Sequence, residues 1–150
     1  MKVCNEFNAT LRFGHVKEYD EARHMARVYF PDMGLISHWL PVIVPNSIMN
    51  HDELHVDLEE HVACLMQGQG TEAGIIIGAF YDDKNKPPVK KLNIRSVIFS
   101  DGTQVLYDRK EHVLEVNCAG EVRVRAPKIL LDGGVIELDG SVVCPGYCRC

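Results

Sequence analysis

The C-terminal end of the chain carries three clustered cysteines, Cys144, Cys148 and Cys150. Thiols at positions i and i+2 of an extended chain fall on the same side, so Cys148 and Cys150 can act together. Thiolates favour tetrahedral zinc, iron or an iron–sulfur cluster. If three copies of the chain met on a threefold axis, all three cysteines of each copy would contribute to one metal site. The alternative interpretation is a poorly ordered terminus with free thiols.

A second group of potential ligands consists of His51, His55 and His61. A His-x-x-x-His spacing can hold a metal ion when it lies on a helix. The acidic residues around these histidines show no spacing that would complete a ligand set, so we interpret the group as part of a polar surface loop. The sequence also lacks a glycine-rich phosphate loop before a helix and a Gly-x-Ser-x-Gly motif. We therefore expect no catalytic residues and no enzymatic activity.

Composition restricts the possible partners. The net charge is -5, and the only local concentration of lysines is Lys86, Lys90 and Lys91. A nucleic-acid binder usually carries a basic stripe that neutralises phosphates. We interpret the lysines as a solvated linker and expect no nucleic-acid partner. No apolar run reaches the ~18 residues that span a bilayer, and no signal-peptide pattern opens the chain, so we expect synthesis and retention in the cytosol.

The stretch 97–143 shows a repeating pattern of short apolar-alternating runs between turn signals. The predicted strands are about 104–107, 113–118, 121–125, 128–131, 135–138 and 141–143. Apolar residues at alternate positions indicate half-buried strands. The apolar face includes Leu114, Val116, Val122, Val124, Ile129 and Leu131.

A ladder of about 45 residues is too small to form a core by itself, and its apolar face needs a cover. Either the preceding domain folds over the ladder, or identical ladders from other subunits wrap around a common axis. We favour the second arrangement, because turns at this density extend a structure along an axis. The six apolar residues named above then form the trimer interface.

Residues 10–82 have the pattern of a small barrel with strands near 11–19, 22–30, 35–44, 60–66 and 73–80. We expect Gly14 to mark a bend or bulge in the first strand. Residues 46–58 show no strong periodicity and are predicted to be a long polar loop. Five short, bent strands in about 70 residues suit an OB-like barrel. Residues 83–96, charged and containing Pro87 and Pro88, are predicted to be a linker.

Several segments in this order resemble the central spike of contractile phage tails, the baseplate assembly protein V family, which is related to the spikes of type VI secretion and R-type bacteriocins. The matching segments span about 11–118. They are Arg12-Phe13-Gly14-His15-Val16, Ala26-Arg27-Val28, Trp39-Leu40-Pro41, Gly74-Ile75-Ile76-Ile77-Gly78-Ala79-Phe80-Tyr81, Phe99-Ser100-Asp101-Gly102-Thr103 and Tyr107-Asp108-Arg109.

The resemblance implies an all-β protein with an N-terminal OB-fold barrel at 10–82, a linker, a short intertwined trimeric β-helix or β-prism at 97–143, and a tip at 144–150. It implies a homotrimer in the virion tail baseplate, assembled in the host cytoplasm. Its partners would be tail hub and baseplate proteins, a tip-capping protein and the host cell envelope that the spike punctures. Larger members of this family end in a His-x-His pair around iron. By that analogy iron is favoured over zinc at Cys144, Cys148 and Cys150.

Trp39, the only tryptophan, has two open interpretations: an anchor of the barrel or a contact with a neighbouring subunit. Two other functions would require features of their own. A monomeric OB-fold nucleic-acid binder would need exposed aromatics interleaved with basic residues, which this sequence lacks. A small redox or metal enzyme using the terminal cysteines would need a cofactor or substrate pocket, for which the sequence gives no sign.

Overall fold

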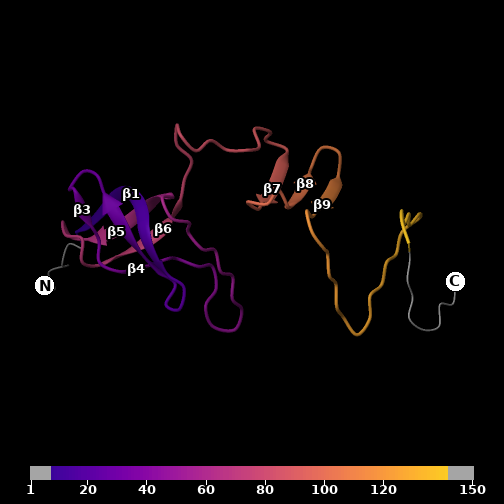
Figure 1. Cartoon of the computed structure of the whole chain (residues 1–150), viewed down its shortest axis with the longest axis horizontal. Helices are drawn as coiled ribbons and strands as arrows, with labels where there is room; N and C mark the ends of the chain where they lie inside the picture. The colour runs from indigo at the N-terminus through magenta and orange to yellow at the C-terminus, as the bar shows by residue number, and fades with distance from the viewer. Residues whose placement is uncertain (1–7, 142–150) are drawn as a thin grey trace, which may run out of the picture. The chain divides into compact units, whose positions relative to one another are not determined.

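A computed structural model of the chain describes residues 8–141, which form two units with a boundary between Lys90 and Lys91 (Figure 1). The described part is all-β, and all the strand pairing between named strands is antiparallel. Residues 8–141 contain no helix, and so none that could cross a membrane. The predicted all-β class is therefore confirmed for these residues.

The N-terminal unit contains six strands. They are β1 (Ala9–Asp20), β2 (Met25–Phe30), β3 (Leu35–Ile36), β4 (Leu40–Pro41), β5 (His61–Gln67) and β6 (Gly74–Ala79). The long strand β1 pairs with both β2 and β5, and β5 pairs with β6. On the other side β4 pairs with β2, and the next residue, Val42, forms a parallel bridge to Ile76 of β6. The strands β1, β2, β4, β6 and β5 therefore close into a ring.

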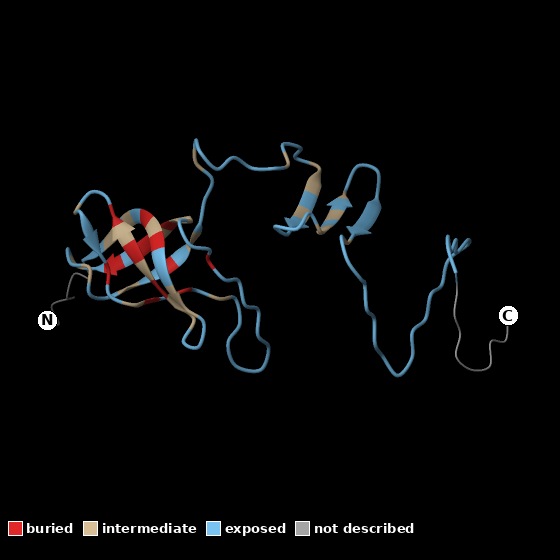
Figure 2. Ribbon diagram, in the orientation of Figure 1, coloured by how far each residue is buried: buried red, intermediate tan, exposed pale blue. Residues whose placement is uncertain are grey.

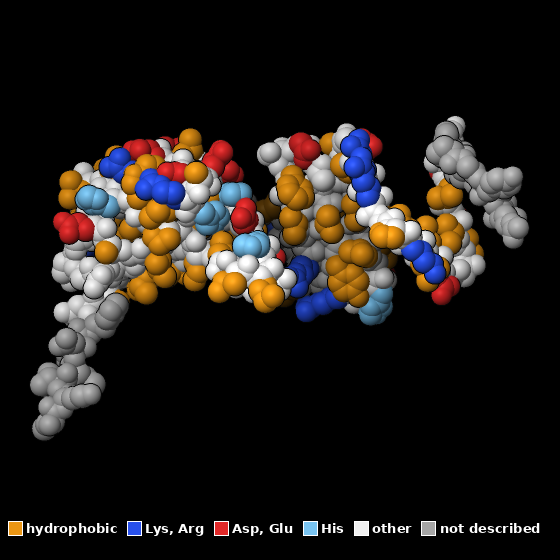
Figure 3. All heavy atoms as spheres, turned by 90° about the horizontal axis from the view of Figure 1, so that it is seen from below, with side chains coloured by type: hydrophobic (Ala, Val, Ile, Leu, Met, Phe, Trp, Pro, Cys, Tyr) orange, Lys and Arg blue, Asp and Glu red, His pale blue; other side chains and the backbone are white. Residues whose placement is uncertain are grey.

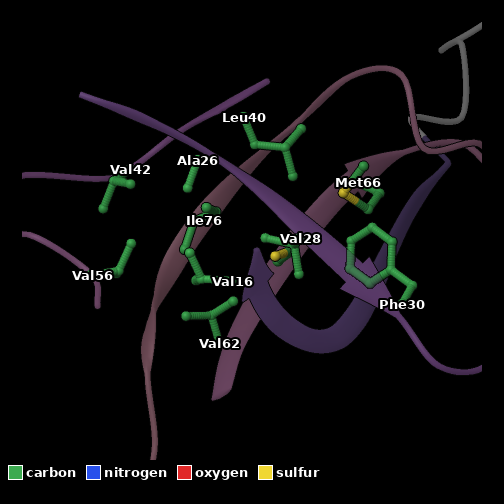
Figure 4. Close-up of a cluster of buried hydrophobic side chains, with 11 residues drawn as sticks. Val16, Ala26, Val28, Phe30, Leu40, Val42, Val56, Val62, Met66 and Ile76 are labelled. Carbon is green, nitrogen blue, oxygen red and sulfur yellow. The ribbon is translucent and has the colours of Figure 1, made fainter. Parts of the chain in front are cut away.

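This ring encloses a core of apolar side chains whose inward positions alternate along the strands, as a period of two requires (Figure 4). The alternation is clearest in β2, where every second residue is buried. In Figure 2 the buried residues gather in this unit. The core comprises Val16, Ala26, Val28, Phe30, Leu40, Val42, Val56, Val62, Cys64, Met66 and Ile76.

Gly14 does not mark the bulge of β1. The bulge of β1 lies between Val16 and Glu18, whereas Gly14 pairs regularly with Val62. A Cβ at Gly14 would lie 2.3 Å from the carbonyl oxygen of Tyr29. Glycine is needed here because the backbone of the neighbouring strand β2 lies too close to Gly14 for any side chain.

The predicted single strand at 35–44 is wrong, because the chain breaks it into β3 and β4. Ser37, between them, is fully buried. Its backbone N–H donates to the Val28 carbonyl (2.8 Å), while its hydroxyl accepts from the Val28 N–H (2.9 Å). The side chain thus replaces a backbone partner and interrupts the ladder.

The C-terminal unit has one three-stranded sheet in the order β7 (Ile94–Ile98), β8 (Gln104–Asp108) and β9 (Val113–Asn117). The start of β7 lies inside the segment 83–96 that was predicted to be a linker. The strands predicted beyond residue 118 do not form within the described part of the chain. Residues 118–141 contain no strand.

Candidate functional site

The three-stranded sheet places apolar side chains in rows on one face. Val97, Val105 and Val116 lie directly opposite one another across the three strands. The neighbouring row pairs Tyr107 with Leu114. All five side chains are exposed, from 37% for Val105 to 68% for Leu114. This apolar sheet face, defined by these five residues, is therefore uncovered in the single chain.

The segment that follows the sheet continues the apolar pattern. Every residue from 119 to 141 is exposed. The four predicted interface residues in this segment are between 54% and 67% exposed: Val122, Val124, Ile129 and Leu131. The structure therefore brings Leu114 and Val116 together on one sheet face, while it leaves these four without packing partners in the described chain. Hydrophobic side chains appear at the surface in Figure 3.

The backbone of this segment is also without backbone hydrogen-bond partners among the described residues. Within the described part of the chain, no backbone–backbone hydrogen bond involves residues 119–141. Peptide N–H and C=O groups need partners when apolar neighbours are buried. A segment with alternating apolar residues and a backbone that forms no ladder has the character of an unpaired strand.

The cysteines predicted to bind a metal, Cys144, Cys148 and Cys150, lie outside the described residues. Of the cysteines within them, Cys64 is in the barrel core, where burial raises the pKa of its thiol to about 12. Cys118, at the end of the sheet, donates its thiol hydrogen toward the Glu121 carbonyl at 3.7 Å.

The three histidines that stood out in the sequence belong to different surroundings. His61 stacks on His15 with ring centroids 4.5 Å apart, and its Nδ1 lies 3.1 Å from Asp82. His51 forms only a bridge to Ser47 within the loop. The third, His55, contacts Tyr19 and His24 at the β1–β2 turn.

Tyr19, His24 and His55 form a compact group, called here the Tyr19 cluster. The Tyr19 hydroxyl lies 2.8 Å from Nδ1 of His24 and 2.6 Å from Nδ1 of His55. Burial, and then the negative charges of Glu53 and Glu21, raise the pKa of the Tyr19 hydroxyl. Sequence inspection missed this cluster because His55 is far along the chain from Tyr19 and His24, and only the folded barrel brings its loop to the β1–β2 turn.

The Tyr19 cluster borders a cleft with a volume of about 680 Å³. Tyr19, His55 and Trp39 line it together with Lys17 and with acidic and apolar side chains. Trp39 is half-buried, and the guanidinium groups of Arg23 and Arg27 lie 5.1 and 5.9 Å from its ring centroid. Both arginines are also ion-paired, to Asp20 and Glu18 respectively, so they are not a free basic surface.

No protein-family model matches this chain, and no curated protein matches its sequence.

Proposed function

We propose that this chain is a homotrimeric, non-enzymatic spike at the centre of a contractile-tail baseplate. It would be mounted on the tail hub with other baseplate proteins and driven through the host cell envelope. The observation that carries the proposal is the uncovered apolar sheet face together with the unpaired apolar segment 119–141. Three copies winding around one axis would cover the first and supply partners for the second.

The arrangement of the N-terminal unit supports the barrel part of this proposal. Five strands closing in the order β1, β2, β4, β6, β5 suit a small, partly open OB-fold barrel. The separate sheet at 94–117 followed by an extended apolar segment suits the start of an intertwined β-helix or β-prism. We propose that the stretch 97–143 provides most of the trimer contact.

Energetics favour the same assignment. Full burial of a Val, Leu or Ile side chain contributes about 1.5–3 kcal/mol, so covering a side chain that is about half to two-thirds exposed contributes about 1–2 kcal/mol. Over Leu114, Val116, Val122, Val124, Ile129 and Leu131 this amounts to roughly 6–12 kcal/mol per chain. That is as large as the whole stability of a typical domain.

Light scattering of the purified full-length chain at micromolar concentration tests the proposal directly. A mass of three chains is expected. Val124→Asp, which would bury three unpaired carboxylates in the assembly, should convert the trimer to monomers. A monomeric wild-type chain would refute the spike and leave a monomeric barrel protein, such as a nucleic-acid binder, to be tested by titration with single-stranded DNA.

At the tip we propose a metal ion or iron–sulfur cluster held by Cys144, Cys148 and Cys150 of three chains, with iron ahead of zinc. Such a site would fix three chain ends in one point, and a piercing tip requires that rigidity. Elemental analysis of untagged protein should find metal that is absent from a chain cut after Val143. Metal far below one ion per trimer, with freely titratable terminal thiols, would end this part of the proposal.

A further inference from the structure

The Tyr19 cluster has the donors, geometry and charge of a metal site that is unrelated to the cysteine tip. We propose that His24, His55 and Tyr19 bind a divalent transition-metal ion of the zinc class at the open cleft of the barrel. The proposal concerns the N-terminal unit alone and does not depend on trimer formation.

The ring positions are those expected for two histidines on one ion. Two imidazoles bound through Nδ1 to a tetrahedral zinc, with Zn–N near 2.0–2.1 Å, have ring centroids about 5 Å apart. The centroids of His24 and His55 are 5.2 Å apart. Both Nδ1 atoms are directed at the same point, the Tyr19 oxygen. An ion can take that point only if the Tyr19 oxygen moves away from it.

The third donor must move by more than about 1 Å, because an ion bound along both ring directions would otherwise overlap the Tyr19 oxygen. Donor atoms on a tetrahedral zinc are about 3.3 Å from one another. The Tyr19 oxygen is now 2.8 and 2.6 Å from the two nitrogens, so the three donors must separate by several tenths of an ångström. His55 can provide this movement, because it is exposed and lies in the loop between β4 and β5.

The charges around the cluster favour a cation. Glu21 and Glu53 both act electrostatically on Tyr19, and neither forms an ion pair within residues 8–141. A bound cation would relieve their repulsion and favour loss of the phenolic proton, which leaves to solvent as the oxygen becomes a ligand. A water molecule can take the fourth position, as open zinc sites allow.

His24 has two features that packing of the barrel does not explain. Its backbone φ is +53°, in the left-handed region that non-glycine residues seldom adopt. Its Nε2 atom is buried without a hydrogen-bond partner. Strained backbone concentrates at ligand-binding sites, so the φ of His24 agrees with a site here. An ion on Nδ1 would not reach Nε2 on the other side of the ring, and it therefore does not account for the unpaired Nε2 atom.

The test uses the full-length chain with Cys144→Ser, Cys148→Ser and Cys150→Ser, so that the terminal thiols cannot bind the probe. After chelator treatment, calorimetric titration with zinc chloride should give one ion per chain. Cobalt(II) should bind to the same protein without a thiolate charge-transfer band, because the ligands are nitrogen and oxygen.

Two variants of proposed ligands and one control variant, all in this background, assign the site. His55→Ala, in the exposed loop, should weaken zinc binding by at least about tenfold, because even the partners of metal ligands have effects of that size. His38→Ala is the matched control, because His38 is exposed and outside the cluster, and its zinc affinity should equal that of the parent. His24→Ala should repeat the loss seen with His55→Ala if circular dichroism shows an intact fold.

The possible results distinguish failure of the metal site from failure of the spike function. Absence of zinc binding in the background without the three terminal cysteines would overturn the proposal. Unchanged affinity in the His55→Ala variant would also overturn it, whatever the folding of His24→Ala. A trimer that binds no zinc at this position would leave the spike function intact, and a monomer that binds zinc would refute the spike while the metal site stood.

Discussion

Val116→Asp tests whether the apolar sheet face is covered by other subunits. Val116 lies in the row with Val97 and Val105 and is 54% exposed in the single chain. If the chain works as a monomer, this is an ordinary surface substitution, and the free energy of unfolding should change by no more than about 0.5 kcal/mol. If three copies cover the face, the same carboxylate is buried without a partner.

The expected magnitude in the trimer is far larger. Covering the exposed half of Val116 contributes about 1 kcal/mol, and desolvating an unpaired carboxylate costs several kcal/mol more. With three copies per assembly the total is about 10 kcal/mol, which corresponds to about seven powers of ten in the association constant. The trimer should therefore dissociate at micromolar concentration.

Light scattering over a concentration series, combined with thermal unfolding, measures both effects. Asn117→Asp is the matched control, because it adds the same charge to the next residue of β9 on the opposite face of the sheet. It should leave the mass and the melting temperature nearly unchanged. A Val116→Asp protein that stays trimeric with an unchanged melting temperature would refute the reasoning, as would equal disruption by Asn117→Asp.

Three further predictions concern the barrel. A fragment of residues 1–90 should fold cooperatively and remain monomeric in sedimentation, and a tight trimer of this fragment would move the interface to the N-terminal unit. Gly14→Ala should lower the free energy of unfolding, measured by urea denaturation, by about 2–4 kcal/mol, because its Cβ would overlap the Tyr29 carbonyl. The control Gly70→Ala should have little effect, because the nearest atom to its Cβ is 3.9 Å away. Hydrogen bonds from the Asn85 N–H, the Lys84 N–H and the His61 ring hold the pKa of Asp82 below its usual value. The ionised Asp82 carboxylate therefore stabilises the fold above about pH 4, and this stabilisation is lost as the pH falls through the lowered folded-state pKa. Melting curves of Asp82→Asn should accordingly change less than those of the parent between about pH 6 and about pH 3, and parallel curves would contradict the assignment.

The alternating sequence by itself was sufficient to predict the all-β class and the approximate positions of most barrel strands. Residues 61–67 and 74–79 match the predicted fourth and fifth strands within a residue or two at each end. Alternation is a local property, because it reflects which side of a strand faces a core. For the same reason Leu114 and Val116 could be assigned to one face before their partners were known.

Tertiary structure decided what depends on contacts between distant residues. The break at Ser37 follows from its hydrogen bonds to Val28, and the need for Gly14 follows from the approach of β2. The meeting of His55 with Tyr19 and His24 required closure of the barrel. The strands predicted at 121–138 carry the right pattern, yet the single chain leaves them unpaired. Periodicity specifies which face a strand would bury, but a strand forms only where a second strand supplies its hydrogen bonds.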